Sequence, residues 1–196
     1  MGVLPQTVLS ACQALWKKSR KASLQSAILF GTAGLGKSFF LRQFAAQLAP
    51  DACWLVGQGF LQGLLSTGFT HLQNERNPDF VSAARRYCPD LPWTVLVSHM
   101  PLERERAWAA VGHAVERLAV RLGGLCLLLE DIHGYNTDDL AALRFLYRQW
   151  LHLKAPIFIL SSSRPKLIDG LLEDLAVDAQ LYQADAVQVF ELHALD

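Results

Sequence analysis

Gly31-Thr32-Ala33-Gly34-Leu35-Gly36-Lys37-Ser38 is the stretch of sequence that decides the fold. It fits the pattern G-x-x-x-x-G-K-S, the signature of a phosphate-binding loop. The apolar run 27–30 comes directly before it, and segment 39–44 is expected to continue as a helix after it. A phosphate-binding loop requires this order of strand, loop and helix. The context therefore favours nucleotide binding over a chance glycine-rich turn.

Each part of the loop has a chemical task. The glycines lack a Cβ atom, so the backbone can curl and direct many N–H groups at one triphosphate. The start of the next helix adds free N–H groups and the positive end of the helix dipole. Lys37 brings a full charge to the β- and γ-phosphates, and the hydroxyl of Ser38 is a ligand for Mg²⁺. We expect residues 31–38 to bind the nucleotide.

The rest of the chain alternates between predicted strands and helices, and Thr137 is the predicted N-cap of one helix. Several strands are continuous apolar runs, as expected when helices cover both faces of a parallel sheet. The sequence predicts an α/β fold, a three-layer αβα sandwich with a five-stranded parallel sheet. The predicted strands are 26–30, 53–56, 125–129, 157–160 and 187–191. The predicted helices are 6–20, 38–48, 102–122, 138–152 and 166–176, with short helical pieces and turns over 57–101.

Two adjacent carboxylates, Glu130 and Asp131, follow the apolar strand 125–129. Charged groups at the end of a buried strand are costly unless they have a partner or a task. We expect this strand end to lie beside the phosphate-binding loop. One carboxylate would then hold the Mg²⁺ shell, and the other would polarise a water molecule for attack on the γ-phosphate.

The strand 157–160 is followed by small hydroxyl residues and an arginine, Ser161-Ser162-Ser163-Arg164. Ligands of open α/β sheets bind at the carboxyl ends of the strands, so Arg164 is a candidate sensor of the γ-phosphate. His133, just past the acids, either orients one of them or caps the loop. The residue types alone leave both roles open.

The composition narrows the class of protein. The chain has 196 residues, and its 18 Lys and Arg balance its 18 Asp and Glu. This neutral charge predicts no nucleic-acid partner. The four cysteines are scattered and favour a reducing compartment over a disulfide framework or a zinc site. No apolar run is long enough for a membrane span. We therefore expect a cytoplasmic protein that does not contact a membrane.

Five segments resemble the signal-transduction ATPases with numerous domains. The similarity is closest to the AAA-like ATPase modules of bacterial adenylate and guanylate cyclases, serine/threonine kinases and large transcriptional regulators. The chain departs from that pattern at Thr32, where glutamate is usual, and at Gly134-Tyr135-Asn136, where W-A-D is usual. The resemblance spans about residues 25–195 and rests on segments 31–38, 103–108, 127–133, 159–165 and 189–195.

The resemblance implies a role for each site residue. Lys37 and Ser38 would serve the phosphates and Mg²⁺. Glu130 would take the metal-side position, Asp131 the water-activating position and Arg164 the sensor position. It also implies a single ATPase core over 1–196 that belongs to a larger protein and lacks the helical lid of its relatives.

The expected function is an ATP-binding switch with slow Mg²⁺-dependent hydrolysis. Such a module binds ATP and ADP and acts on its own effector domain or on a protein partner, with nucleotide-dependent self-association. One alternative is a nucleotide-binding scaffold without hydrolysis, and a further alternative is an ATPase of the DNA initiator or loader type.

Overall fold

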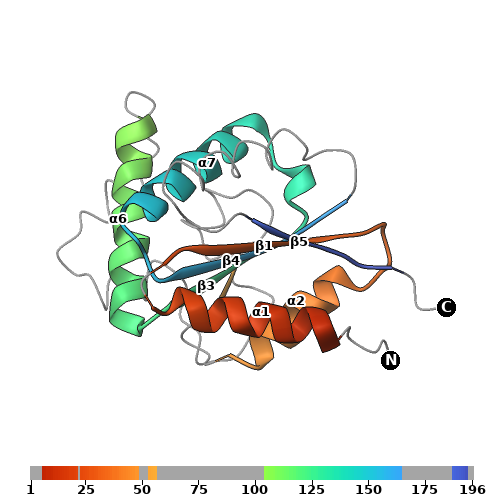
Figure 1. The fold of residues 1–196 in the computed structure, drawn as a ribbon. Coiled ribbons are helices and arrows are strands. Elements are labelled where there is room, and N and C mark those ends of the chain that lie inside the picture. The colour runs from red at the N-terminus through yellow and green to blue at the C-terminus, as the bar shows by residue number, and fades with distance from the viewer. Residues whose placement is uncertain (1–5, 22, 49–52, 57–103, 165–186, 194–196) are drawn as a thin grey trace.

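A parallel β-sheet runs through the centre of the protein, with a layer of helices on each face (Figure 1). The computed structural model describes residues 6–21, 23–48, 53–56, 104–164 and 187–193. The α/β fold predicted from the sequence is confirmed. The predictions for 57–101 and for the helix 166–176 fall outside the described residues.

The sheet has five strands in the order β2-β3-β4-β1-β5, and every neighbouring pair is parallel. All the carboxyl ends therefore meet at one edge, which is where ligands of such sheets bind. The strands are β1 (Gln25–Phe30), β2 (Cys53–Val56), β3 (Leu125–Leu129), β4 (Ile157–Ser163) and β5 (Gln188–Glu191).

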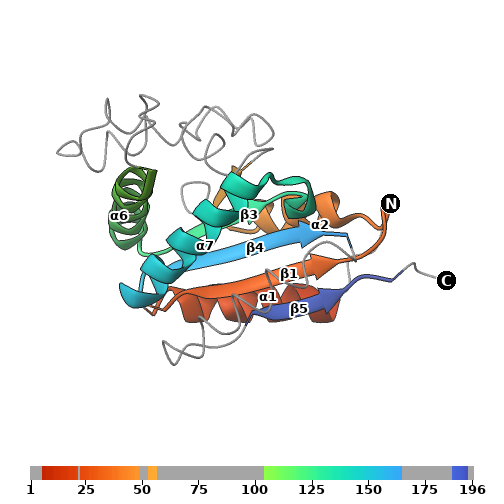
Figure 2. The same ribbon diagram turned by 90° about the horizontal axis from the view of Figure 1, so that it is seen from above.

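Helices α1 and α2 cover one face of the sheet and α7 covers the other, as the two views show (Figures 1 and 2). Helix α6 crosses α7, packs against it and leads into β3. None of the helices in the described part of the chain has the length and apolar character needed to cross a membrane. The helices are α1 (Gln6–Ser19), α2 (Lys37–Ala46), α6 (Arg104–Leu122) and α7 (Thr137–His152), with a short 3₁₀ turn, η2 (Ile132–Gly134).

The core forms where the helices meet the central strands. All residues of β3 and β4 are buried, which agrees with the apolar runs in the sequence. Phe44 of α2 meets Phe158 of β4 edge to face, with 5.8 Å between the ring centroids. On the other face, Trp150 of α7 is fully buried and donates its indole N–H to the carbonyl of Gly112 at 3.0 Å. The central strands are thus held firmly from both sides.

Helix α7 begins one residue earlier than the sequence suggested. The expected N-cap Thr137 is the first residue of the helix, and Asn136 is the cap. The Asn136 side chain accepts a hydrogen bond from the N–H of Asp139 at 2.8 Å. Asparagine is at least as good a cap as threonine, so the residue types alone allow either one. Asn136 is the cap because its backbone is extended, outside the helix.

Strand β4 continues to Ser163, beyond the predicted end at residue 160. Ser161, Ser162 and Ser163 are all buried, so they belong to the sheet and do not form an exposed turn. Strand β4 also lies between β1 and β3. The strands that carry the loop and the acids are therefore not neighbours in the sheet.

Candidate functional site

The glycine-rich loop connects β1 to α2 at the carboxyl edge of the sheet. Gly34 and Gly36 have φ angles of 87° and 78°, a left-handed conformation that side chains with a Cβ atom adopt only at a cost. Gly36 is also the N-cap of α2. The first N–H groups of this helix have no partner within it and point out of its end. Together these features form a backbone cradle for an anion.

Lys37 is the first residue of α2, and its side chain turns back over the loop. Its Nζ donates hydrogen bonds to the carbonyls of Gly31 and Thr32, both at 2.7 Å. An ammonium group has three donors, so one N–H remains for a ligand. Only 7% of Lys37 is exposed. The two carbonyls hold the charge at a fixed point above the loop, where a phosphate would meet it.

A cavity of about 300 Å³ opens at this loop, at the small end of the range for ligand sites. It brings together the loop with the start of α2, one acid and the arginine, which lie on three separate segments of the sequence. Its lining residues are Ala33, Gly34, Gly36, Lys37, Ser38, Phe39, Asp131 and Arg164.

The pKa of Lys37 responds to the charged groups that meet at this cavity. Burial lowers the pKa of the Lys37 ammonium group from its ordinary value, the carboxylate of Asp131 raises it in part, and the guanidinium group of Arg164 lowers it. The ammonium group of Lys37, the carboxylate of Asp131 and the guanidinium group of Arg164 are therefore close enough to interact. The cavity therefore presents two cations and one carboxylate to a ligand.

The two adjacent acids, Glu130 and Asp131, differ in their access to the cavity. Asp131 lines the cavity, whereas Glu130 is half-buried at the end of β3 and is absent from the residues that line it. Burial and then the carboxylates of Asp139, Glu130 and Asp131 raise the pKa of the Tyr135 phenol. Of the acid pair, Asp131 has direct access to a ligand on the loop.

The residues fit a magnesium ion held jointly with a phosphate. Ser38 and Asp131 both line the cavity, and the hydroxyl oxygen of Ser38 is a hard ligand of the kind that suits Mg²⁺. No cluster of three His, Cys, Asp or Glu side chains that could hold a metal occurs among the described residues. Magnesium commonly takes its other ligands from phosphate and water, so this set agrees with nucleotide-dependent binding.

The sequence analysis missed two residues of the site. Phe39 lines the cavity and is 42% exposed. Helical periodicity offers a signal for it, because Phe40, Leu41 and Phe44 form the buried face of α2 and leave Phe39 outside it. Ser162 was grouped with its neighbours, yet its Oγ accepts a hydrogen bond from the N–H of Asp131 at 3.0 Å. No sequence pattern distinguishes this serine from the two beside it.

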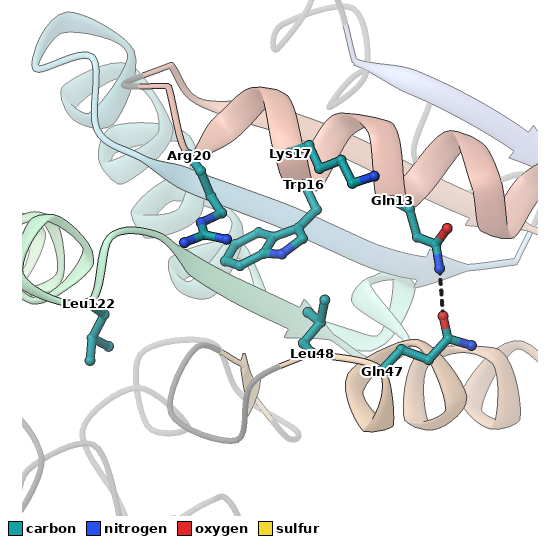
Figure 3. Close-up of a pocket in the computed structure, with 7 residues that line it drawn as sticks. All are labelled: Gln13, Trp16, Lys17, Arg20, Gln47, Leu48 and Leu122. Atoms are coloured by element: carbon teal, nitrogen blue, oxygen red, sulfur yellow. Dashed lines mark hydrogen bonds between the residues drawn. The ribbon is translucent and has the colours of Figure 1, made fainter.

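A second cavity, of about 400 Å³, lies between the ends of α1, α2 and α6 (Figure 3). Trp16 forms one wall, and Arg20 lies beside its ring with its guanidinium carbon 5.8 Å from the ring centroid. Arg20 also donates its Nε–H to the carbonyl of Gly123 at 2.9 Å. The helices reach this cavity with their carboxyl ends, where the dipole is negative. It is therefore a poorer phosphate site than the loop.

Solved structures with the same fold place this geometry in context. Cdc6p from Pyrobaculum aerophilum is 18% identical, with a TM-score of 0.56 over 98% of this chain and 46% of that chain. The chain shares its α/β fold with this protein. Drosophila ORC bound to GC-rich DNA and Cdc6 is 12% identical, with a TM-score of 0.53 over 97% of this chain and 57% of that chain. A Walker-type ATPase of Pyrococcus abyssi is 15% identical, with a TM-score of 0.50 over 99% of this chain and 55% of that chain.

The chain spans about half the length of each of these solved proteins. No protein-family model matches it, and no curated protein matches it significantly. The predicted absence of a nucleic-acid partner gains no support from these structures, because the ORC structure is bound to DNA. At these identities the likeness establishes the fold alone.

Proposed function

We propose that this chain is an ATP-binding switch that hydrolyses Mg·ATP slowly. The observation that carries the proposal is the single cavity where the glycine-rich loop, Lys37, Ser38, Asp131 and Arg164 converge. A loop that presents N–H groups and a fixed ammonium group selects phosphates. A carboxylate and an arginine at the same cavity add the parts that phosphoryl transfer requires.

In this proposal the loop residues 31–38 hold the triphosphate. The free N–H of Lys37 contacts the β- and γ-phosphates, and the hydroxyl of Ser38 is a ligand of Mg²⁺, which neutralises charge on the phosphates. Glu130, which lies off the cavity, acts on the outer shell of the metal through water. Asp131 polarises the attacking water, and Arg164 contacts the γ-phosphate.

Slow turnover is expected because the catalytic groups remain in contact with solvent. The Asp131 side chain is 54% exposed, and Arg164 is exposed as well. Water around these charges weakens their interaction with the phosphates and leaves the nucleophile poorly held. A closing segment from a lid or a partner would raise both affinity and rate.

The switch role rests on the resemblance to signalling ATPases. A switch works when the nucleotide binds two conformations with different affinities. We propose that ATP and ADP bias this core between two such states within a larger signalling or regulatory protein. An effector domain or a partner, or a second copy of the chain, would read the state.

Two measurements test the function. Calorimetry with Mg·ATP measures binding, and phosphate release measures hydrolysis. Binding with steady release supports the ATPase. Binding without release in the full protein identifies a non-hydrolysing scaffold, and absence of binding rejects the nucleotide site.

An initiator-type ATPase acting on DNA is the second candidate, because one structure with this fold is bound to DNA. The equal numbers of basic and acidic residues, 18 each, oppose it, since DNA-binding surfaces are usually basic. Salt-dependent binding to duplex DNA would favour this candidate over the signalling switch.

A further inference from the structure

Three consecutive buried serines end β4, and their hydroxyls have three different partners. Ser161 Oγ donates to the carbonyl of Ala27 on β1 at 3.3 Å. Ser163 Oγ donates to the carbonyl of Arg164 at 3.1 Å. Ser162 Oγ accepts from the backbone N–H of Asp131 at 3.0 Å. Ser162 therefore connects β4 to the acid that lines the nucleotide cavity.

This hydrogen bond lies where the backbone pairing of β3 and β4 ends. The last paired residues are Leu129 and Ser161. Beyond them Asp131 adopts the left-handed conformation, with φ 50° and ψ 49°, and starts the turn η2. Aspartate tolerates this conformation better than most residues, but at some cost. The N–H of Asp131 lies past the end of the β3–β4 ladder, and the hydroxyl of Ser162 accepts its hydrogen bond there.

Two other groups act on the carboxylate of Asp131, the ammonium group of Lys37 and the imidazole of His133. The Asp131 side chain is 54% exposed, and its Oδ1 lies 3.8 Å from Nδ1 of His133, which is beyond hydrogen-bonding distance. Nδ1 of His133 is itself buried without a hydrogen-bond partner. Asp131 also lines the nucleotide cavity. Its backbone angles set where the carboxylate lies between Nδ1 of His133 and the cavity.

We infer that Ser162 is a positioning residue for Asp131. Its hydroxyl holds the left-handed turn from which the carboxylate of Asp131 reaches the nucleotide cavity. This inference rests on the proposed function, because it assigns Asp131 to the attacking water. Ser162 contacts neither water nor nucleotide in this role and acts only through the backbone of Asp131.

The test compares Ser162→Ala with Ser26→Ala. Ser26 is a buried serine on the neighbouring strand β1, and its hydroxyl hydrogen bonds to Tyr147 at 3.2 Å, so it controls for the loss of one buried hydrogen bond. Thermal unfolding confirms that both variants fold. Ser162→Ala should lower kcat about ten- to hundredfold, as expected for a misaligned catalytic group, and change the Kd for Mg·ATP less than twofold. Ser26→Ala should leave both constants unchanged.

A double-mutant cycle separates positioning from a general effect on structure. In the Asp131→Asn background, Ser162→Ala should lower kcat no further, because the group that it positions has lost its charge. Independent losses that add in the double variant would overturn the inference, as would equal kcat values for Ser162→Ala and Ser26→Ala.

Amide hydrogen exchange of the protein without nucleotide tests the contact itself. Ser162→Ala should lower the protection of the Asp131 amide at least tenfold and leave the amides of β1 unchanged. Unchanged protection at Asp131 would overturn the inference even if turnover falls. If the wild-type chain releases no phosphate, the proposed function fails, and the exchange experiment still shows whether Ser162 holds the turn.

Discussion

Leu129 of β3 pairs with Ser161 of β4 in the parallel ladder. This register brings the segment that follows β3 beside the last residues of β4. The acid Asp131 and the base Arg164 consequently reach one cavity, although 33 residues separate them in the sequence (164 − 131). The phosphate-binding loop reaches the same cavity from β1, on the other side of β4.

Lys37→Ala should weaken the binding of Mg·ATP by about ten- to hundredfold or more, since a hydrogen bond to a charged group contributes about 1.5–3 kcal/mol. The fold should remain intact, because within the described part of the chain the hydrogen bonds of the lysine go to carbonyls of its own loop. Calorimetry measures the affinity, and circular dichroism checks the fold. Lys17→Ala removes an exposed charge from α1 and is the matched control. A Lys37 variant that binds ATP like the wild type would contradict the assignment of the loop.

Asp131→Asn should keep the affinity for ATP and lower turnover by about 10²–10⁴-fold, the usual contribution of general base catalysis. The amide preserves the shape of the side chain and removes the base. Glu130→Gln should instead raise the Mg²⁺ concentration needed for half-maximal turnover. Phosphate release at a series of Mg²⁺ concentrations distinguishes the two effects, and the opposite pattern would mean that the two acids have exchanged roles.

Arg164→Ala should weaken the binding of ATP by about ten- to hundredfold and the binding of ADP by much less. The reason is that a sensor at this strand end contacts the γ-phosphate alone. Arg42→Ala, which removes an exposed arginine from α2, should affect neither nucleotide. Competition binding with ATP and ADP measures the ratio. Equal losses for the two nucleotides would place Arg164 outside the γ-phosphate site.

The loop and the strands could be predicted because their signals are local. The G-x-x-x-x-G-K-S pattern defines the turn at Gly36 and the charge at Lys37 without reference to the rest of the chain. The apolar runs 125–129 and 157–160 are typical of central strands with helices on both faces. These local features were enough to predict an α/β fold with the candidate site at the carboxyl edge.

The order of the strands and the partners of the serines could not be predicted. Which strand lies between β1 and β3 depends on contacts between distant segments, and no local pattern encodes it. Ser161, Ser162 and Ser163 are identical in type and adjacent in sequence. Only their register against β1 and β3 gives them different partners.

Gly112→Ala should destabilise the fold by less than about 2 kcal/mol. Adding atoms to a filled space costs about 1–3 kcal/mol, and the gain in helix propensity inside α6 reduces this cost by about 1 kcal/mol. A Cβ atom at this position would meet the amide end of Gln149 and lie 2.9 Å from Cδ2 of Leu146, where α6 crosses α7. Gly134→Ala is the control, because a Cβ atom there has no neighbour within 4 Å. Urea unfolding measures both free energies, and equal stability of the two variants would show that α7 can move away from α6.

Cys12 should make the stability of the protein depend on pH in alkaline solution. The Cys12 thiol is fully buried, and burial raises its pKa from 9.0 to about 12. Between these values the unfolded chain loses the thiol proton and the folded chain keeps it, so the unfolded state binds fewer protons. Stability should therefore fall as the pH rises from 9 towards 12, by about 1.4 kcal/mol per pH unit from this group.

Cys12→Ala isolates this contribution from the lysines and tyrosines that titrate in the same range. The variant should be less stable than the wild type at pH 8, because it loses buried volume, and the difference between the two should shrink as the pH rises above 9. Urea unfolding at pH 8, 9.5 and 10.5 in a reducing buffer measures this difference in the free energy of unfolding. A constant difference at all three values would mean that the thiol ionises equally easily in the folded and unfolded states. Its burial would then have no energetic effect on the proton.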